Sequence, residues 1–355
     1  MAGLGLLGTA LVAAAAVCLG SGCSTLAYYG QAAQGHLDLS HRARPVQDWL
    51  NEDGTPGTLR ERLQLTQRMR DFAVTELMLP DNDSYRRYAD LQRPAAVWNV
   101  VAAPELSLQL KTWCFAVMGC VGYRGYFDRA AADRLADELR AQGFEVSVYG
   151  VPAYSTLGWT NWMGGDPLLN TFVNWPEGEL ARLIFHELAH QVAYAADDTT
   201  FNESFATAVE RLGGERWLKD HATPQARELA RKLDERRNEF RALMQRQRDQ
   251  LAALYASALP EADKRARKAE LMAALRQSYE TLKRERWGGY AGYDAWVAGA
   301  NNASFGVQAA YNELVPAFER LFDRRGRDFD RFYAEVKRLA ALPWDERRAA
   351  LLSQP

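Results

Sequence analysis

Two histidines and a glutamate stand close together in the segment His186-Glu187-Leu188-Ala189-His190. In an α-helix, residues four positions apart lie only about 40° apart around the axis, one turn along it. His186 and His190 can therefore direct two imidazole nitrogens at one metal ion, and zinc is the ion typical of this spacing. Glu187 falls beside the metal, where its carboxylate can act as a general base in hydrolysis. The pattern predicts a zinc-dependent peptidase.

A catalytic zinc ion usually has three protein ligands and one position left for water. One known arrangement places a glycine three and a histidine six residues after the second histidine, but Ala193 and Ala196 occupy these positions. Glu203 lies thirteen positions after His190, which leaves enough chain for a turn and an antiparallel return to the metal. We therefore favour Glu203 as the third ligand, since a three-ligand site is the expected catalytic form.

Glu203 also has a competing structural use. Thr200 and Glu203 fit the capping box of a helix start, in which the carboxylate binds backbone N–H groups instead. In that case Glu210, two turns further along the same helix face, would be the ligand. If Glu203 is the ligand, Glu210 is expected to contact one of the metal ligands rather than the metal itself.

The segment that carries the motif has the pattern of an amphipathic helix. Pro176 and the two glutamates that follow it are typical of a first turn, and apolar residues recur at helical spacing from Leu180 to Ala195. We expect the motif to lie in the middle of this helix. A second helix at about 201–212 is predicted to end at Gly213-Gly214.

The elements before the motif are mixed, and the residues from 24 to about 60 show no assignable pattern. After that point, some segments show apolar residues at helical spacing, and others show the Val-rich or alternating runs of strands. We predict helices at about 59–79 and 128–142 and strands at about 95–102 and 144–149, the second strand being extended or paired by 151–157.

The chain after the motif reads as mostly helical. From about Pro224 to Arg286 it is rich in charged residues, with leucines at a spacing near 3.5, which predicts a long helical hairpin turning around Ser257–Pro260. Its charges are expected to form a solvated face. Further helices are predicted around 301–322 and 329–342, so the fold class is α+β, with a small sheet early and helices late.

The first 22 residues have the pattern of an export signal. No charged residue occurs from Gly3 to Gly20, and Ser21-Gly22-Cys23 then places small residues before a cysteine. We expect Cys23 to carry a lipid after cleavage, as in bacterial lipoproteins. Another cleaved signal and an uncleaved membrane anchor remain open, since 18 apolar residues are near the lower limit for spanning.

Cysteine usage and net charge limit the location and the partners. Cys114 and Cys120 form an even pair that predicts a small disulfide loop in an oxidising compartment, while a two-cysteine metal site would lack a matching pair. With 43 basic and 45 acidic residues, the net charge is −2 and no block of one sign occurs. Nucleic acid is therefore excluded as an expected partner, because phosphate binding requires a concentrated basic surface.

The motif residues resemble a known class of metallopeptidases. His186-Glu-Leu-Ala-His190 followed by Asn202-Glu203 is similar to the gluzincins, and the mature chain resembles a family of bacterial lipoproteins described as zinc aminopeptidases. The segments that carry this second resemblance are Gly22–Ser24, Tyr28–Gln31, Ser84–Leu91, Trp113–Phe115, Gly122–Phe127, Pro152–Trp159, Asn301–Ala303 and Val315–Phe318.

The resemblance implies a zincin-like core with one zinc ion on His186, His190 and Glu203 and with Glu187 as the base. Zincins place an edge strand that pairs with an extended substrate shortly before the metal helix, where this chain has residues 151–158; an ordinary connecting strand is the alternative at this place. The Gly-x-Met-Glu-Asn segment of the best-known gluzincin aminopeptidases is not in this sequence, so the peptidase assignment is stronger than the aminopeptidase one. The donor that stabilises the transition state is left open among Tyr290, Tyr293, Tyr311 and His221.

Together these observations predict four regions. They are an export signal at 1–22, a zincin-like catalytic core at 23–222, the charged hairpin at 223–287 and a helical part at 288–355 that completes the catalytic unit. We expect a peptide substrate, attachment to the periplasmic side of a bacterial membrane, and sorting to the outer membrane because Ser24 rather than Asp follows Cys23. The alternative is a non-catalytic envelope lipoprotein with a structural or vestigial zinc site and a partner-binding hairpin.

Overall fold

A computed structural model describes residues 23–115, 119–154, 164–196, 198–310 and 313–353. Three predicted features lie wholly or partly outside these residues. They are the signal at 1–22, residues 155–158 of the segment 151–158, and Tyr311. Within them, no helix is both long enough and apolar enough to cross a membrane.

The first helix is one that the sequence pattern did not reveal. The described part of the chain begins with α2 (Cys23–Arg42), β1 (Arg44–Pro45), α3 (Val46–Asn51) and α4 (Gly57–Thr75). Helix α2 has few strongly apolar residues, so it shows no clear periodicity. It forms because it packs across the sheet, where Gly35 lets the Phe127 ring approach the helix backbone directly.

The central sheet is small and antiparallel, with strand order β6-β3-β7. The segments that build the sheets are β2 (Arg87–Ala89), β3 (Val97–Pro104), β4 (Trp113–Phe115), β5 (Gly119–Val121), β6 (Arg124–Tyr126), α5 (Arg129–Ala141), β7 (Phe144–Val151) and β8 (Leu168–Leu169). Strands β1, β2 and β8 form a second sheet, and β4 pairs with β5. In that hairpin Cys114 lies opposite Cys120, and a disulfide joins them.

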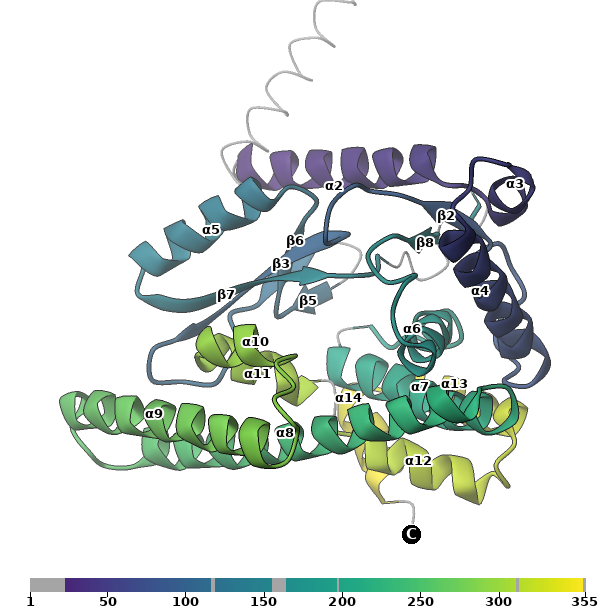
Figure 1. Ribbon diagram of the computed structural model, residues 1–355. Coiled ribbons are helices and arrows are strands. Elements are labelled where there is room, and N and C mark those ends of the chain that lie inside the picture. The colour runs from purple at the N-terminus through teal and green to yellow at the C-terminus, as the bar shows by residue number, and fades with distance from the viewer. Residues whose placement is uncertain (1–22, 116–118, 155–163, 197, 311–312, 354–355) are drawn as a thin grey trace, which may run out of the picture.

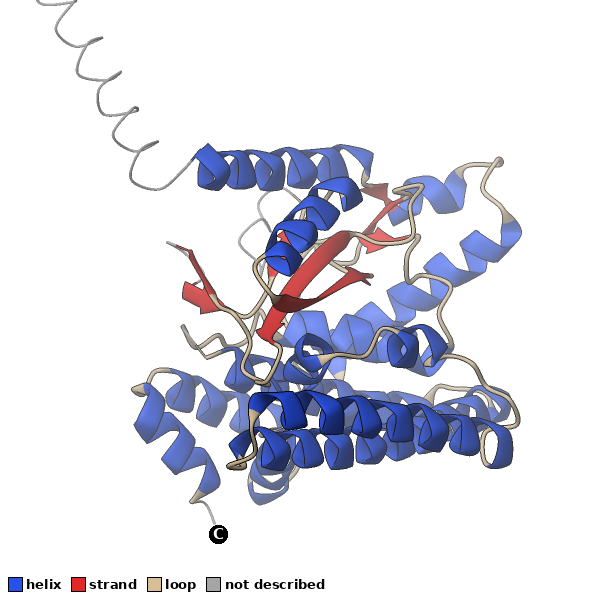
Figure 2. Ribbon diagram, turned by 90° about the vertical axis from the view of Figure 1, so that its left-hand side faces the viewer, coloured by secondary structure: helices blue, strands red, loops and turns tan. Residues whose placement is uncertain are grey.

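The two faces of the central sheet pack against different helices. Val100 and Ala102 of β3 pack with α5, whereas Val101 and Ala103 contact Ala303 of α11 (Asn302–Ala310) on the opposite face. Figures 1 and 2 show the sheet between α2 and α5 on one side and the large helical layer on the other. One face of the sheet is therefore turned toward the helical layer that contains the histidine motif and Glu203.

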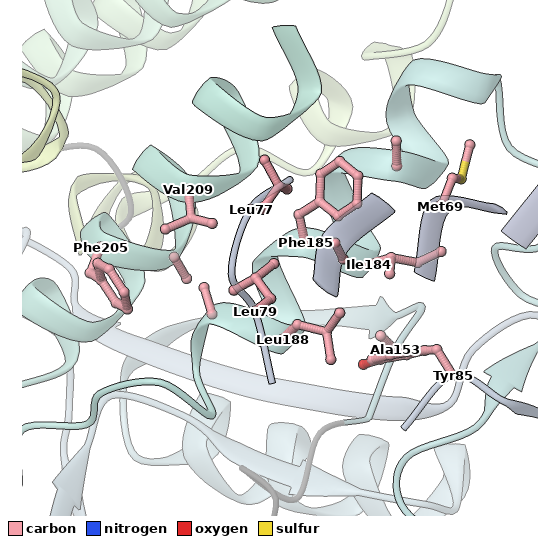
Figure 3. Close-up of a cluster of buried hydrophobic side chains, with 14 of the residues drawn as sticks. Met69, Leu77, Leu79, Tyr85, Ala153, Ile184, Phe185, Leu188, Phe205 and Val209 are labelled. Atoms are coloured by element: carbon pink, nitrogen blue, oxygen red, sulfur yellow. The ribbon is translucent and has the colours of Figure 1, made fainter. Parts of the chain in front are cut away.

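The helical layer is built around α6 (Glu177–Ala189) and α7 (Thr199–Asp220). Figure 3 shows apolar residues of both helices packed with Leu77, Leu79 and Tyr85 of the preceding segment. The remaining helices are α8 (Pro224–Ala256), α9 (Glu261–Glu285), α10 (Asp294–Ala298), α12 (Val315–Arg324), α13 (Phe329–Ala340) and α14 (Trp344–Leu352).

The α+β class is confirmed, and most predicted elements are found within a few residues of their expected bounds. The long charged segment forms α8 and α9 with a turn at 257–260, and these helices enclose their own apolar cluster around Phe240 and Tyr279. The predicted helix at 301–322 is divided into α11 and α12, with Pro316 in the first turn of α12.

Two predicted helix ends are wrong. Helix α6 ends at Ala189 rather than near Ala195, so the histidine motif occupies its last turn and not its middle. Helix α7 continues through Gly213-Gly214 to Asp220. These glycines do not end the helix but allow close packing: a Cβ atom on Gly213 would lie 2.6 Å from Leu77 Cδ1.

This packing predicts an unusual response to Gly213→Ala. Alanine normally stabilises a helix by about 1 kcal/mol relative to glycine. Here we expect the free energy of unfolding to fall by about 1–3 kcal/mol, because the new methyl group meets Leu77 and Phe185. Urea denaturation measures the change. Gly30→Ala in α2 is the control, since no atom lies within 4 Å of its Cβ position, and equal stability of both variants would contradict the packing argument.

Candidate metal centre

His186, His190 and Glu203 converge where the end of α6 meets the start of α7. The two Nε2 atoms lie 3.2 Å apart, and Glu203 Oε2 lies 3.3 Å from His186 Nε2 and 3.7 Å from His190 Nε2. Zinc at roughly 2.05 Å from each of three tetrahedral ligands would separate the ligand atoms by roughly 3.3 Å. The three spacings thus suit a single tetrahedral ion.

The chemistry of these groups also suits zinc, which binds imidazole nitrogen and carboxylate oxygen. Both histidines are buried. Burial lowers the pKa of His190 to about 4, so its imidazole is neutral near pH 7, as a ligand must be. Burial also acts to lower the pKa of His186, but hydrogen bonds to Glu203 and Glu210 outweigh it and raise that pKa. The two carboxylates therefore favour a positive charge at this point, either a proton or a cation.

Glu210 supports His186 from the side opposite Glu203. Its Oε2 atom lies 2.9 Å from His186 Nδ1, so the Nδ1–H group can donate to it and leave Nε2 free for a metal. Burial would raise the pKa of Glu210, but the bond to His186 and the charges of Arg182 and Arg237 lower it, so the carboxylate stays ionised. The structure places Glu210 in the supporting position, not as the ligand.

The turn between the two helices fixes the position of Glu203. Asp198, not Thr200, caps α7: its side chain accepts a hydrogen bond of 3.0 Å from the Phe201 backbone N–H. The capping box, the alternative role considered for Glu203, is therefore not formed, and the Glu203 side chain faces the histidines. Asn202 holds the turn by two hydrogen bonds of 2.8 Å to the backbone N–H and C=O of Ala195.

Two ion pairs attach distant helices to this region. Arg347 of α14 donates to Asp198 at 2.8 Å, and both side chains are only 6% exposed. Arg182 of α6 forms a two-pronged pair with Asp234 of α8 at 2.5 and 2.7 Å. Some charged residues of the hairpin, such as Asp234, thus bind α6, whereas the sequence predicted a solvated face for the whole segment.

Glu187 lies beside the three converging groups and is partly exposed. Its carboxylate is close to Tyr85: burial is the main cause that raises the pKa of the Tyr85 hydroxyl, and the charge of Glu187 adds to it. The Tyr85 segment is held to the end of the motif, because Gln191 donates to Ser84 Oγ at 3.1 Å and accepts from Asn82 at 2.7 Å. The charge of Glu187 therefore acts in the region where the Tyr85 segment meets the histidine motif.

Tyr123 and Tyr149 approach the site from the sheet. Burial raises the pKa of both phenols, and the charge of Glu203 raises it further. The sequence gave no reason to choose them, because only the strand register brings them to this face. Of the residues considered instead, Tyr290 and Tyr293 pack in the hairpin cluster, and His221 stacks on Trp217 at 4.8 Å between ring centres.

Comparison with known proteins gives one family. The family model described as "Putative aminopeptidase" matches residues 27–351. No curated protein and no solved structure matches the chain.

The supporting role of Glu210 can be measured through metal affinity. We expect Glu210→Gln to weaken zinc binding roughly 10- to 100-fold, the usual effect of removing a partner that orients a ligating histidine. Competition with a chromophoric chelator measures the affinity. Glu215→Gln, on the exposed side of the same helix, should bind zinc like the unmodified protein. Equal affinity of the Glu210 and Glu215 variants would show that Glu210 has no part in the metal centre.

Proposed function

This chain belongs to that aminopeptidase family, and we propose that it is a zinc-dependent peptidase with the metal on His186, His190 and Glu203. One observation carries the proposal: the three ligand atoms are separated by 3.2, 3.3 and 3.7 Å, with Glu187 adjacent in the same helical turn. The family match extends over residues 27–351, so it includes the helical second half as well as the motif.

In this proposal, each residue of the site has a separate role in peptide hydrolysis. Zinc, when bound, lowers the pKa of a water molecule and polarises the scissile carbonyl. Glu187 accepts one proton from the attacking water and later delivers it to the nitrogen of the leaving amine, so that the C–N bond breaks without forming an amide anion. Glu210 keeps His186 in the tautomer that presents Nε2, and Asp198 and Asn202 hold Glu203 in place.

Within the peptidase class, we propose that the substrate is a peptide cleaved at its amino terminus. Support comes from the family description, while the sequence does not contain the usual glutamate-asparagine motif that grips an amino group. Any group that binds the ammonium must therefore differ from that motif.

We further propose that the protein acts outside the cytoplasm, attached by a lipid on Cys23 to the periplasmic side of a membrane. The uncharged stretch from Gly3 to Gly20 and the small residues before Cys23 support export. The disulfide between Cys114 and Cys120 fits an oxidising compartment. Ser24 supports sorting to the outer membrane.

Glu187→Gln tests the reaction. The amide cannot accept the proton from water, so we expect peptide hydrolysis to fall by roughly 10²- to 10⁴-fold while one zinc ion stays bound. Turnover of unblocked peptides and metal content by atomic absorption are measured on the same sample. His190→Ala is the companion variant and should lose zinc and activity together. Hydrolysis that survives Glu187→Gln would favour a structural zinc site and a binding function.

Blocked substrates test the position of cleavage. If a free amino terminus is required, a peptide and its N-acetylated form should differ in kcat/KM by roughly 100-fold or more, because a buried ammonium partner would be left unpaired. Mass spectrometry of the products identifies the bond that is cut. Equal hydrolysis of both peptides would assign the protein as an endopeptidase.

A further inference from the structure

We propose that the hydroxyl of Tyr123 donates a hydrogen bond to the negatively charged oxygen that develops on the scissile carbonyl. This inference rests on the proposed peptidase function and names a catalytic residue for it. The residue comes from the sheet and stands far before the histidine motif in the sequence.

Strand register and packing give the direction of the Tyr123 side chain. Asn99 of β3 lies opposite Gly125 of β6, and a Cβ atom on Gly125 would lie 3.1 Å from Asn99 Oδ1, so both residues face the same side. Tyr123 immediately precedes β6, and its side chain belongs to the apolar cluster that Val101 and Ala103 form on that face. This is the side of the sheet that α11 covers.

The same face is turned toward the metal ligands. Helix α11 contacts both this face of β3 and helix α7, which carries Glu203. Glu203 is the charged group that acts most strongly on the Tyr123 hydroxyl, after the effect of burial itself. The Tyr123 hydroxyl is thus near enough to Glu203 to be affected by its charge.

The hydrogen bonds distinguish Tyr123 from its neighbour on the same face. The Tyr149 hydroxyl is already hydrogen-bonded to the Asn99 side chain. Among the described residues, no group makes a hydrogen bond with the Tyr123 hydroxyl. Burial and the nearby carboxylate raise the pKa of Tyr123, so the phenol keeps its proton near pH 7 and remains a donor.

The reaction needs such a donor at one step. When water adds to the scissile carbonyl, the C–O bond to the incoming oxygen forms and the π pair moves onto the carbonyl oxygen. A donor fixed near that oxygen stabilises this charge more than it stabilises the neutral carbonyl, so it raises kcat more than it lowers KM. The phenol proton stays on Tyr123, while Glu187 carries the proton transferred from water to the leaving amine.

The test compares Tyr123→Phe with Tyr149→Phe in the full chain. Both changes remove one hydroxyl from the same sheet face, but only the first removes a hydroxyl that no described residue hydrogen-bonds. We expect Tyr123→Phe to lower kcat by roughly 10²- to 10³-fold, with KM changed less than about threefold and one zinc ion still bound. Tyr149→Phe should retain kcat within about threefold of the unmodified protein.

Inhibitor binding gives a readout that a structural role would not change. A phosphinic peptide carries a tetrahedral, negatively charged oxygen, so its Kd should rise by about the same factor as kcat/KM falls in Tyr123→Phe, while the Kd of the uncleaved substrate in the Glu187→Gln background stays constant. Unchanged kcat in zinc-loaded Tyr123→Phe, or an equal loss in Tyr149→Phe, would overturn the assignment. Failure of the peptidase function itself would instead appear as no hydrolysis by the unmodified protein.

Discussion

The candidate site depends on one turn of chain between α6 and α7. Helix α6 must stop at Ala189 so that the chain can reverse and return Glu203 to the imidazoles. Asn202 closes this turn by pairing with both backbone groups of Ala195, and Asp198 starts the next helix. Without these contacts, two histidines on one helix would supply only two ligands. The turn therefore adds Glu203 as a third candidate ligand to the two histidines that helical spacing brings together.

The rest of the helical layer keeps this turn and its helices in place. Arg347, near the carboxyl end, pairs with the capping residue Asp198, so α14 supports the turn from outside. The ion pair between Arg182 and Asp234 joins α6 to α8. The Arg347–Asp198 pair is buried on both sides, so removing one partner would strongly destabilise the protein by leaving an uncompensated charge. The long hairpin and the last helix are therefore part of the architecture that positions the candidate metal ligands.

Sequence reasoning predicted those features that depend on local spacing. The closeness of the i and i+4 histidines and the charged hairpin follow from helical periodicity alone. For Glu210 the sequence left two roles open, ligand or supporting partner, and the fold places it beside His186 Nδ1. The end of α6 and the passage of α7 through Gly213 were missed, because contacts with distant residues such as Leu77 decide them. Tyr123 could not be chosen from the sequence, since strand pairing determines which side of the sheet it faces.

The central claim is that His186, His190 and Glu203 hold one zinc ion. X-ray absorption at the zinc edge, on protein isolated with its metal, tests it most directly. The structure predicts about one zinc per chain, with two imidazole nitrogens and oxygen ligands at roughly 2.0–2.2 Å and no sulfur. His186→Ala should abolish this signal. A sulfur ligand, an unchanged signal in His186→Ala, or protein that binds no zinc when supplied with it would contradict the proposed metal centre.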